Sequence, residues 1–175
     1  MNLEPFQDEA TLSQLVGCWE GILRLRGAAD QPFEEFPGKS ENRWVLGGRF
    51  VEMTLRGGAE SDGWSALFYI GHERSERRYV VVSLEPGDRR VTIRHGEWIS
   101  DPGRLLLTSR GKPGEEPRRS SVVCDVRTPG TLKLELAEEG ASGEEFVRFS
   151  AHYRATAATS PAAPRPRPPR RFVIA

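Results

Sequence analysis

The pattern of hydrophobic and polar positions changes its period once, close to the start of the chain. Residues 8–16 have the spacing of a short helix, with Thr11 as a candidate cap and Leu12 and Leu15 on one face. From Gly17 onward the period is two, so that apolar and polar residues alternate as they do in a half-buried strand. The sequence therefore predicts one short N-terminal helix followed by β structure.

The strand pattern recurs about nine times, at the spacing of β-hairpins. Residues 27–39, rich in glycine, proline and acids, are expected to form a loop. Consecutive strands joined by short turns favour an up-and-down antiparallel sheet, and a sheet of this size curls or closes. We therefore predict an all-β fold, a single closed antiparallel barrel, with a two-sheet sandwich as the alternative. The expected strands cover roughly residues 17–26, 43–56, 64–70, 78–84, 91–95, 105–107, 118–126, 132–136 and 144–156.

Two runs place a tryptophan close to glycines inside strand-like segments. Trp19 lies between Gly17 and Gly21, and Trp44 precedes Gly47-Gly48. Glycine weakens a strand unless it marks a bulge, a bend or a close approach of two backbones. The apolar positions change parity at Gly47-Gly48, which predicts a bulge within one long strand. Trp19 is predicted to pack at a closed end of the barrel.

These runs resemble the signature of an uncharacterised bacterial family of calycin-like (lipocalin-like) β-barrels. Residues 15–21 and 44–50 match its first two motifs, and Tyr153-Arg154 fits its end. A third region departs from the family pattern, with Gly71-His72-Glu73 where the family tends to have Gly-Tyr-Asp. The resemblance covers roughly residues 11–154 and implies the barrel fold of a domain of unknown function. The chain is also distantly similar to nitrobindin-type barrels, which bind haem.

The histidines are the first candidates for a functional group. His95 has the parity of Val91 and Ile93, which predicts that it faces the interior as a polar group in an apolar pocket. A histidine held by structural hydrogen bonds is the alternative. The resemblance to nitrobindin-type barrels implies a haem ligand on a late strand, where His152 lies, but His152 shares a polar face with Arg148. We therefore expect His152 to face solvent, and we expect no haem, no other cofactor and no metal ion.

The expected function is the binding of a small, largely apolar molecule inside the barrel. No nucleophile motif is present, so no catalytic residue is assigned. One alternative is a small barrel enzyme, a lyase, isomerase or hydrolase with His95 as its base, and another is an interaction domain without a ligand. Arg49 and Arg154 are candidates for packing over Trp19 or pairing with an acid. The expected ligand-binding residues are His95, Met53, Trp64, Phe68 and Val81.

Composition divides the chain of 175 residues into a barrel domain, residues 1–156, and a tail, residues 157–175. The tail is rich in proline and arginine, which predicts a disordered segment that is dispensable for folding and able to contact a protein partner.

The formal net charge is zero, and without the four arginines of the tail the remainder carries −4. A domain of this sign is a poor candidate for binding nucleic acid.

The location and the assembly of the protein follow less directly from the sequence. The acidic N-terminus does not resemble a signal peptide, and no segment is apolar for long enough to enter a membrane. We expect a cytoplasmic protein in which the two cysteines, Cys18 and Cys124, do not form a disulfide. Monomer and homodimer both stay open.

Overall fold

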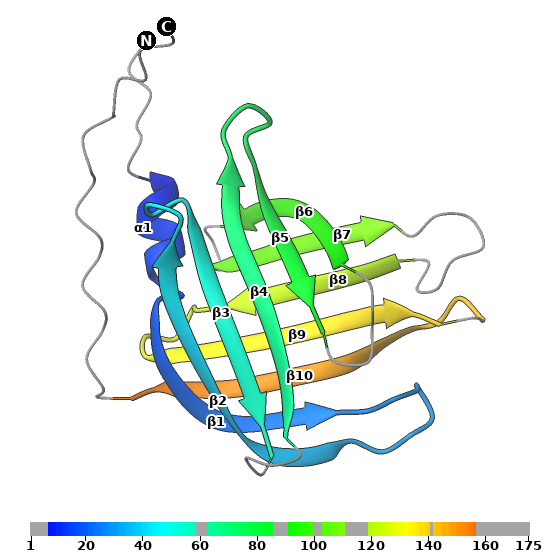
Figure 1. Ribbon diagram of the computed structural model, residues 1–175. Coiled ribbons are helices and arrows are strands. Elements are labelled where there is room, and N and C mark those ends of the chain that lie inside the picture. Colours follow the sequence, from blue (N-terminus) through cyan, green and yellow to red (C-terminus); the bar gives the residue numbers. More distant parts are fainter. Residues whose placement is uncertain are drawn as a thin grey trace, which may run out of the picture.

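The computed structural model describes residues 7–58, 63–85, 91–99, 103–110, 119–140 and 142–156. Within these ranges the chain forms one helix and ten antiparallel strands that close into a barrel (Figure 1). Each strand pairs with its neighbours in sequence, and β1 also pairs with β10. The predicted all-β barrel with a short N-terminal helix is confirmed. The elements are α1 (Gln7–Ser13), β1 (Gly17–Leu25), β2 (Glu34–Val45), β3 (Phe50–Gly57), β4 (Trp64–Glu73), β5 (Arg78–Leu84), β6 (Val91–Ile99), β7 (Arg104–Arg110), β8 (Arg119–Asp125), β9 (Thr131–Glu139) and β10 (Glu145–Ala155).

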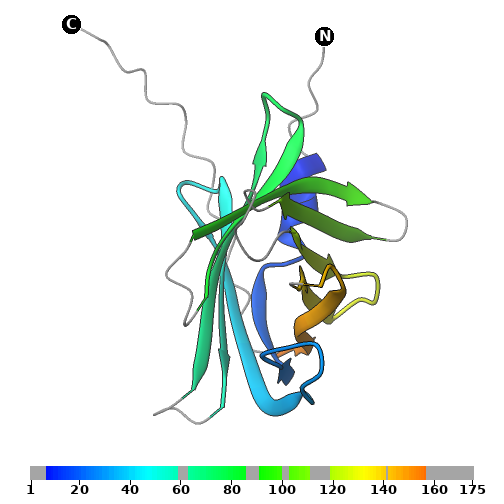
Figure 2. The same ribbon diagram turned by 90° about the vertical axis from the view of Figure 1, so that its right-hand side faces the viewer.

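The helix α1 lies against one end of the barrel, which we call the helix end (Figures 1 and 2). Leu12 and Leu15 are buried there beside Trp19. The indole Nε1–H of Trp19 donates to the Leu15 carbonyl at 3.1 Å, and Asn42 Nδ2 donates to the same carbonyl at 2.7 Å. These two hydrogen bonds tie the segment after the helix to β1 and β2, so the helix end is closed. Thr11 is a buried residue inside α1, rather than the cap that we expected.

The chain has one strand more than we predicted, because residues 27–39 are not all loop. β2 begins at Glu34, and its inward positions include Gly38, Ser40 and Asn42, which are small or polar. An alternation of apolar and polar residues is therefore missing from this strand, and the sequence pattern does not reveal it. The expected tail, residues 157–175, and its boundary lie outside the described residues.

The glycines of the two tryptophan runs have two different roles. The predicted bulge at Gly47-Gly48 is wrong, because these residues form the turn between β2 and β3. Leu46, Gly47 and Gly48 have φ angles of 51°, 71° and 82°, and three successive residues in this region reverse the chain. Gly21 marks a close approach of two backbones, because a Cβ atom there would lie 1.9 Å from the His152 carbonyl oxygen.

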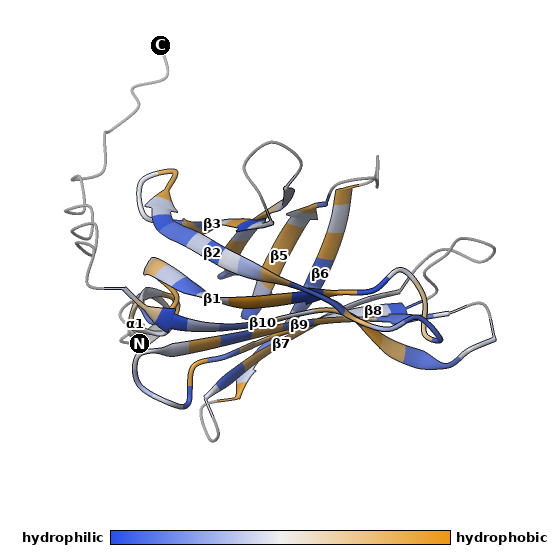
Figure 3. Ribbon diagram, turned by 90° about the horizontal axis from the view of Figure 1, so that it is seen from below, coloured by the Kyte–Doolittle hydropathy of each residue, from blue (hydrophilic) through white to orange (hydrophobic). Residues whose placement is uncertain are grey.

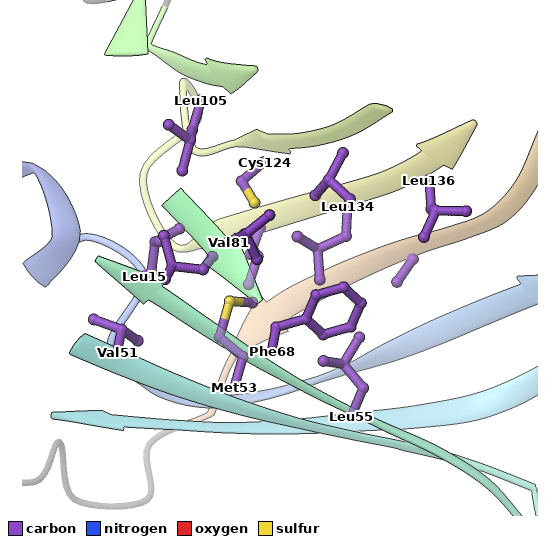
Figure 4. Packing of buried hydrophobic residues seen from close by; sticks show 14 of the residues in the cluster. Leu15, Val51, Met53, Leu55, Phe68, Val81, Leu105, Cys124, Leu134 and Leu136 are labelled. Atoms are coloured by element: carbon purple, nitrogen blue, oxygen red, sulfur yellow. The ribbon is translucent and has the colours of Figure 1, made fainter. Parts of the chain in front are cut away.

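The interior of the barrel is packed with apolar side chains from most of the strands. Met53, Phe68, Val81 and Leu134 point toward one another (Figure 4). The cavity left among Met53, Phe68, Leu134 and neighbouring side chains has a volume of about 10 Å³, which is about the space of one water molecule. The closed helix end therefore leads into a filled, apolar centre.

The two cysteines differ in their exposure, and this predicts different reactivity. Cys124 is fully buried in the core and Cys18 is partly exposed on β1, and neither is in a disulfide. Burial raises the pKa of the Cys124 thiol to about 12, and the thiolate is the form that reacts. In the native protein we expect Ellman's reagent to label Cys18 alone, and after denaturation without reductant to label both thiols. Rapid labelling of both in the native state would contradict the buried position of Cys124, and labelling of neither after denaturation would indicate a disulfide.

Candidate functional site

Four of the five predicted ligand contacts lie around the barrel interior. Met53, Phe68 and Val81 are buried core residues. Trp64 is partly buried and stacks on Phe149, with 5.2 Å between the ring centroids. Their interior positions agree with the alternation along β3, β4 and β5, but whether they contact a ligand stays a prediction.

His95 lies on the outer face of the barrel, and the prediction that it faces the interior is wrong. The register pairs Arg94 with Val81, which is fully buried, so Arg94 and not His95 points inward. The parity argument assumed that Val91 and Ile93 are buried, but they are 58% and 51% exposed. The expected exposure of His152 on the outer face of β10 is confirmed.

Arg94 is the largest fully buried side chain of the described residues, with 1% of its surface exposed. Its Nε–H donates to Ser120 Oγ at 2.9 Å, and its Nη1 donates to Ser83 Oγ at 2.7 Å. Its Nη2 lies 3.9 Å from Glu85 Oε1, which is an ion-pair distance but too long for a hydrogen bond. A charged guanidinium is thus held inside the barrel mainly by two neutral hydroxyl groups.

Other polar side chains gather at the same level of the barrel. Ser109 and Ser120 share a hydrogen bond of 2.8 Å. Six consecutive strands, or the residues that follow them, contribute to this group, and each member lies in the half of its strand that is far from α1. We call this group the polar cluster and the end that it occupies the far end. The polar cluster consists of Glu85, Arg94, Ser109, Ser120, Glu138 and Arg148.

A β-bulge places Arg148 in the polar cluster. The register between β9 and β10 shifts between Val147 and Phe149, so Arg148 is the extra residue. Its Nη1 lies 3.0 Å from Glu138 Oε1 and 3.7 Å from Glu85 Oε2. The expectation that Arg148 shares a simple solvent face with His152 is therefore wrong, because the bulge turns its side chain toward the two carboxylates.

The charges of the polar cluster balance, since it contains two arginines and two glutamates. Burial raises the pKa of the Glu85 carboxyl group, an effect that Arg94 and Arg148 oppose. Burial also lowers the pKa of Arg94, although a guanidinium stays protonated in proteins. Perturbed ionisable groups of this kind are frequent at functional sites, although structural ion pairs produce them too.

The two arginines proposed to pack over Trp19 are both solvent-exposed. Arg49 lies in the turn between β2 and β3, and Arg154 lies on the outer face of β10. Two acids close to them pair with other residues: Glu52, three positions from Arg49, accepts from Arg43, and Glu20, opposite Arg154 in the register, lies 3.1 Å from Lys39. Neither arginine closes the barrel, and α1 with Trp19 does so instead.

The described residues form neither a cluster of metal-ligating side chains nor a membrane-spanning helix. In the part of the chain that the structure describes, no three His, Cys, Asp or Glu side chains gather as a metal ion requires. α1, with seven residues, is far too short to cross a bilayer, and no other helix lies within the described ranges. The enzyme alternative requires that His95, as its catalytic base on β6, faces a cavity inside the barrel, and His95 does not.

The family described as "Protein of unknown function (DUF1579)" matches residues 4–154. The chain belongs to this family. The family assignment and the barrel together confirm the uncharacterised barrel family that the two glycine–tryptophan runs indicated. No curated protein matches the chain.

Among solved structures, the chain is similar to Rv2717c from M. tuberculosis. The two share 18% identity over 89% of this chain and 99% of that chain, with a TM-score of 0.64. A likeness at this identity shows a shared fold, and the activity of this chain has to be argued from its own residues.

Proposed function

We propose that this protein binds a small, largely apolar molecule inside the barrel, with one polar group of that molecule hydrogen-bonded to Arg94. The observation that carries the proposal is the complete burial of the Arg94 side chain between two serines. Keeping a charge inside a protein costs several kcal/mol, and a well-packed apolar residue often serves stability as well or better. A role in ligand binding explains why a guanidinium is kept in the interior, whereas packing alone does not.

The arrangement around Arg94 suits an elongated molecule with one polar end. Arg94 lies at the far end, whereas Met53, Phe68 and Phe149 line the apolar centre. Ligand sites in proteins are mostly apolar, with a few placed polar groups that orient the ligand. The bulge at Arg148 supports the same reading, because bulges often re-aim side chains next to functional sites.

The small size of the cavity determines how a ligand can bind inside the barrel. At about 10 Å³ the cavity holds no molecule larger than water, so a ligand has to displace side chains. Met53 lines this cavity, and its unbranched, flexible side chain is suited to such a displacement. We expect the ligand to enter from the far end, because α1 closes the helix end.

Native mass spectrometry of protein purified from its own host tests this proposal. We expect the wild-type chain to carry a small molecule, Arg94→Met to lose it, and the control Arg154→Met, on the outer face, to retain it. The Arg94→Met variant is expected to fold, because methionine fills much of the same volume without a buried charge. A melting curve checks this. The proposal is contradicted if the wild-type protein is bare, or if Arg94→Met carries the molecule as well as Arg154→Met does.

A second candidate function, a ligand-free interaction domain, is favoured by the filled interior. In that case Arg94, Ser83 and Ser120 are a structural network, and every variant in the mass spectrometry experiment is bare. The alternative of an enzyme with His95 as its base lacks support, because His95 lies outside the barrel.

A further inference from the structure

The guanidinium of Arg94 offers hydrogen-bond donors and no acceptor. Among the described residues, its Nε–H and one N–H of Nη1 have hydrogen-bond partners, Ser120 and Ser83. The Nη2 group lies 3.9 Å from Glu85, which is too far for a hydrogen bond. A guanidinium has more N–H groups than these two bonds use, so a ligand group that meets Arg94 has to be a hydrogen-bond acceptor.

The positive charge of Arg94 already has a counter-charge from the chain itself. Glu85 directly follows β5, and its Oε1 is the atom that lies 3.9 Å from Arg94 Nη2. The hydroxyl group of Ser83 joins the two side chains, because it accepts from Arg94 Nη1 at 2.7 Å and donates to Glu85 Oε1 in a long hydrogen bond of 3.4 Å. The side chain of Glu85 is 12% exposed, so water screens its charge only weakly.

The other charges of the polar cluster are matched in the same way. Arg148 Nη1 lies 3.7 Å from Glu85 Oε2 and 3.0 Å from Glu138 Oε1. Two arginines thus face two glutamates, and their formal charges add up to zero. Among the residues that the structure describes, Arg94 is the one buried cation. An anion that entered the barrel would therefore find no positive charge beyond those that the two glutamates already balance.

The rest of the interior suits a hydrocarbon chain. Met53, Phe68 and Phe149 line the central cavity. The strands that carry Ser83 and Arg94 are hydrophobic over much of their length, and Figure 3 shows hydrophobic segments on β5 and β6. The interior thus combines an apolar centre with one buried donor group whose charge is already compensated.

We infer, on the basis of the proposed function, that the ligand is an uncharged amphiphile whose carbonyl or hydroxyl oxygen accepts a hydrogen bond from Arg94. Glu85 determines this selectivity. A ligand carboxylate would place a further negative charge beside Glu85, in a group of charges that is neutral without it, and this repulsion disfavours acids. A ligand ammonium group has no acceptor and would face the guanidinium. An uncharged oxygen leaves the balance of charges as it is.

Isothermal titration calorimetry of the full chain at neutral pH, with decanol and decanoate as probes, tests the inference. The probes have chains of equal length and differ in charge. We expect the wild type to bind decanol at least about tenfold more tightly than decanoate. We expect Glu85→Gln to bind decanoate more tightly than decanol, because the variant leaves an arginine without its counter-charge and the carboxylate of the probe supplies one.

The matched control is Glu20→Gln, which removes the same charge from the exposed outer face of β1. We expect this variant to keep the preference of the wild type for decanol. The change of preference in Glu85→Gln is the decisive result, because any apolar interior favours an alcohol over an acid to some extent. Glutamine has nearly the shape of glutamate and its amide oxygen can still accept from Ser83, so we expect the variant to fold, and circular dichroism checks this.

Three results overturn the inference: a wild type that binds decanoate at least as tightly as decanol, a Glu85→Gln variant that still prefers decanol or whose change of preference Glu20→Gln shares, and a wild type that binds neither probe. None of them by itself contradicts the proposed function, which stands as long as native mass spectrometry finds a molecule on the wild type that Arg94→Met loses. A wild type that is bare in that experiment shows that the proposed function has failed as well.

Discussion

Replacing Trp19 by alanine is expected to lower the free energy of unfolding by about 3–5 kcal/mol, the range for deleting a large buried aromatic side chain. The indole is 6% exposed, and it belongs to the core beside Leu12 and Leu15. The substitution leaves a cavity where α1 meets the barrel and removes the Nε1–H bond to the Leu15 carbonyl. Urea unfolding, with the slope compared between variants, measures the change.

The control for this experiment is Trp19→Phe, which keeps an aromatic ring and loses the indole N–H. Asn42 still donates to the Leu15 carbonyl in this variant. We therefore expect a smaller loss, about 1–2 kcal/mol, for the missing hydrogen bond and the reduced ring. An alanine variant within about 0.5 kcal/mol of wild type, the usual size of a surface effect, would show that Trp19 does not close the helix end.

The second large effect is expected from Gly21→Ala, at or above the upper end of the roughly 1–3 kcal/mol typical of overpacking. The added Cβ would lie 1.9 Å from the His152 carbonyl oxygen and 3.0 Å from the Tyr153 Cα. Both are main-chain atoms of β10, so no rotamer change relieves the contact. β1 and β10 have to separate locally, and the melting temperature is expected to fall sharply.

Gly47→Ala is the matched control, because a Cβ there meets no atom within 4 Å. Its φ of 71° still disfavours alanine, and this conformational effect is worth about 1–2 kcal/mol. The difference between the two variants measures the backbone contact at Gly21 itself. Equal losses for both would mean that β1 and β10 approach less closely than the structure has them.

Much of the fold can be predicted from the sequence because apolar and polar residues alternate along a strand as its side chains alternate between the interior and solvent. Val51, Met53 and Leu55 alternate with polar residues on β3, and the same pattern marks β9. β2 cannot be recognised in this way, because its interior positions are occupied by glycine, serine and asparagine. The sequence at Gly47-Gly48 predicts a bulge in place of the turn because both features use glycine and both change the parity of the pattern.

The candidate site is harder to predict, because it depends on two exceptions to alternation. Arg94 faces inward, whereas the apolar residues Val91 and Ile93 before it face outward, and this reverses the usual preference of each. Arg148 is directed by a bulge that no glycine or proline marks. The register of β6 against β5 shows that Arg94 faces inward, since its partner Val81 and the nearby Ser83 are both buried. Such pairing is visible only in the assembled sheet.

The closure of the barrel by β1 and β10 also determines how the protein responds to force. The two strands are antiparallel neighbours, and Trp19 near the start of β1 pairs with Ala155 at the end of β10. The flanking chain therefore leaves both strands at the same end of the barrel. A pull on the two termini loads the hydrogen bonds of this seam one after another and peels the strands apart, instead of shearing the whole row at once.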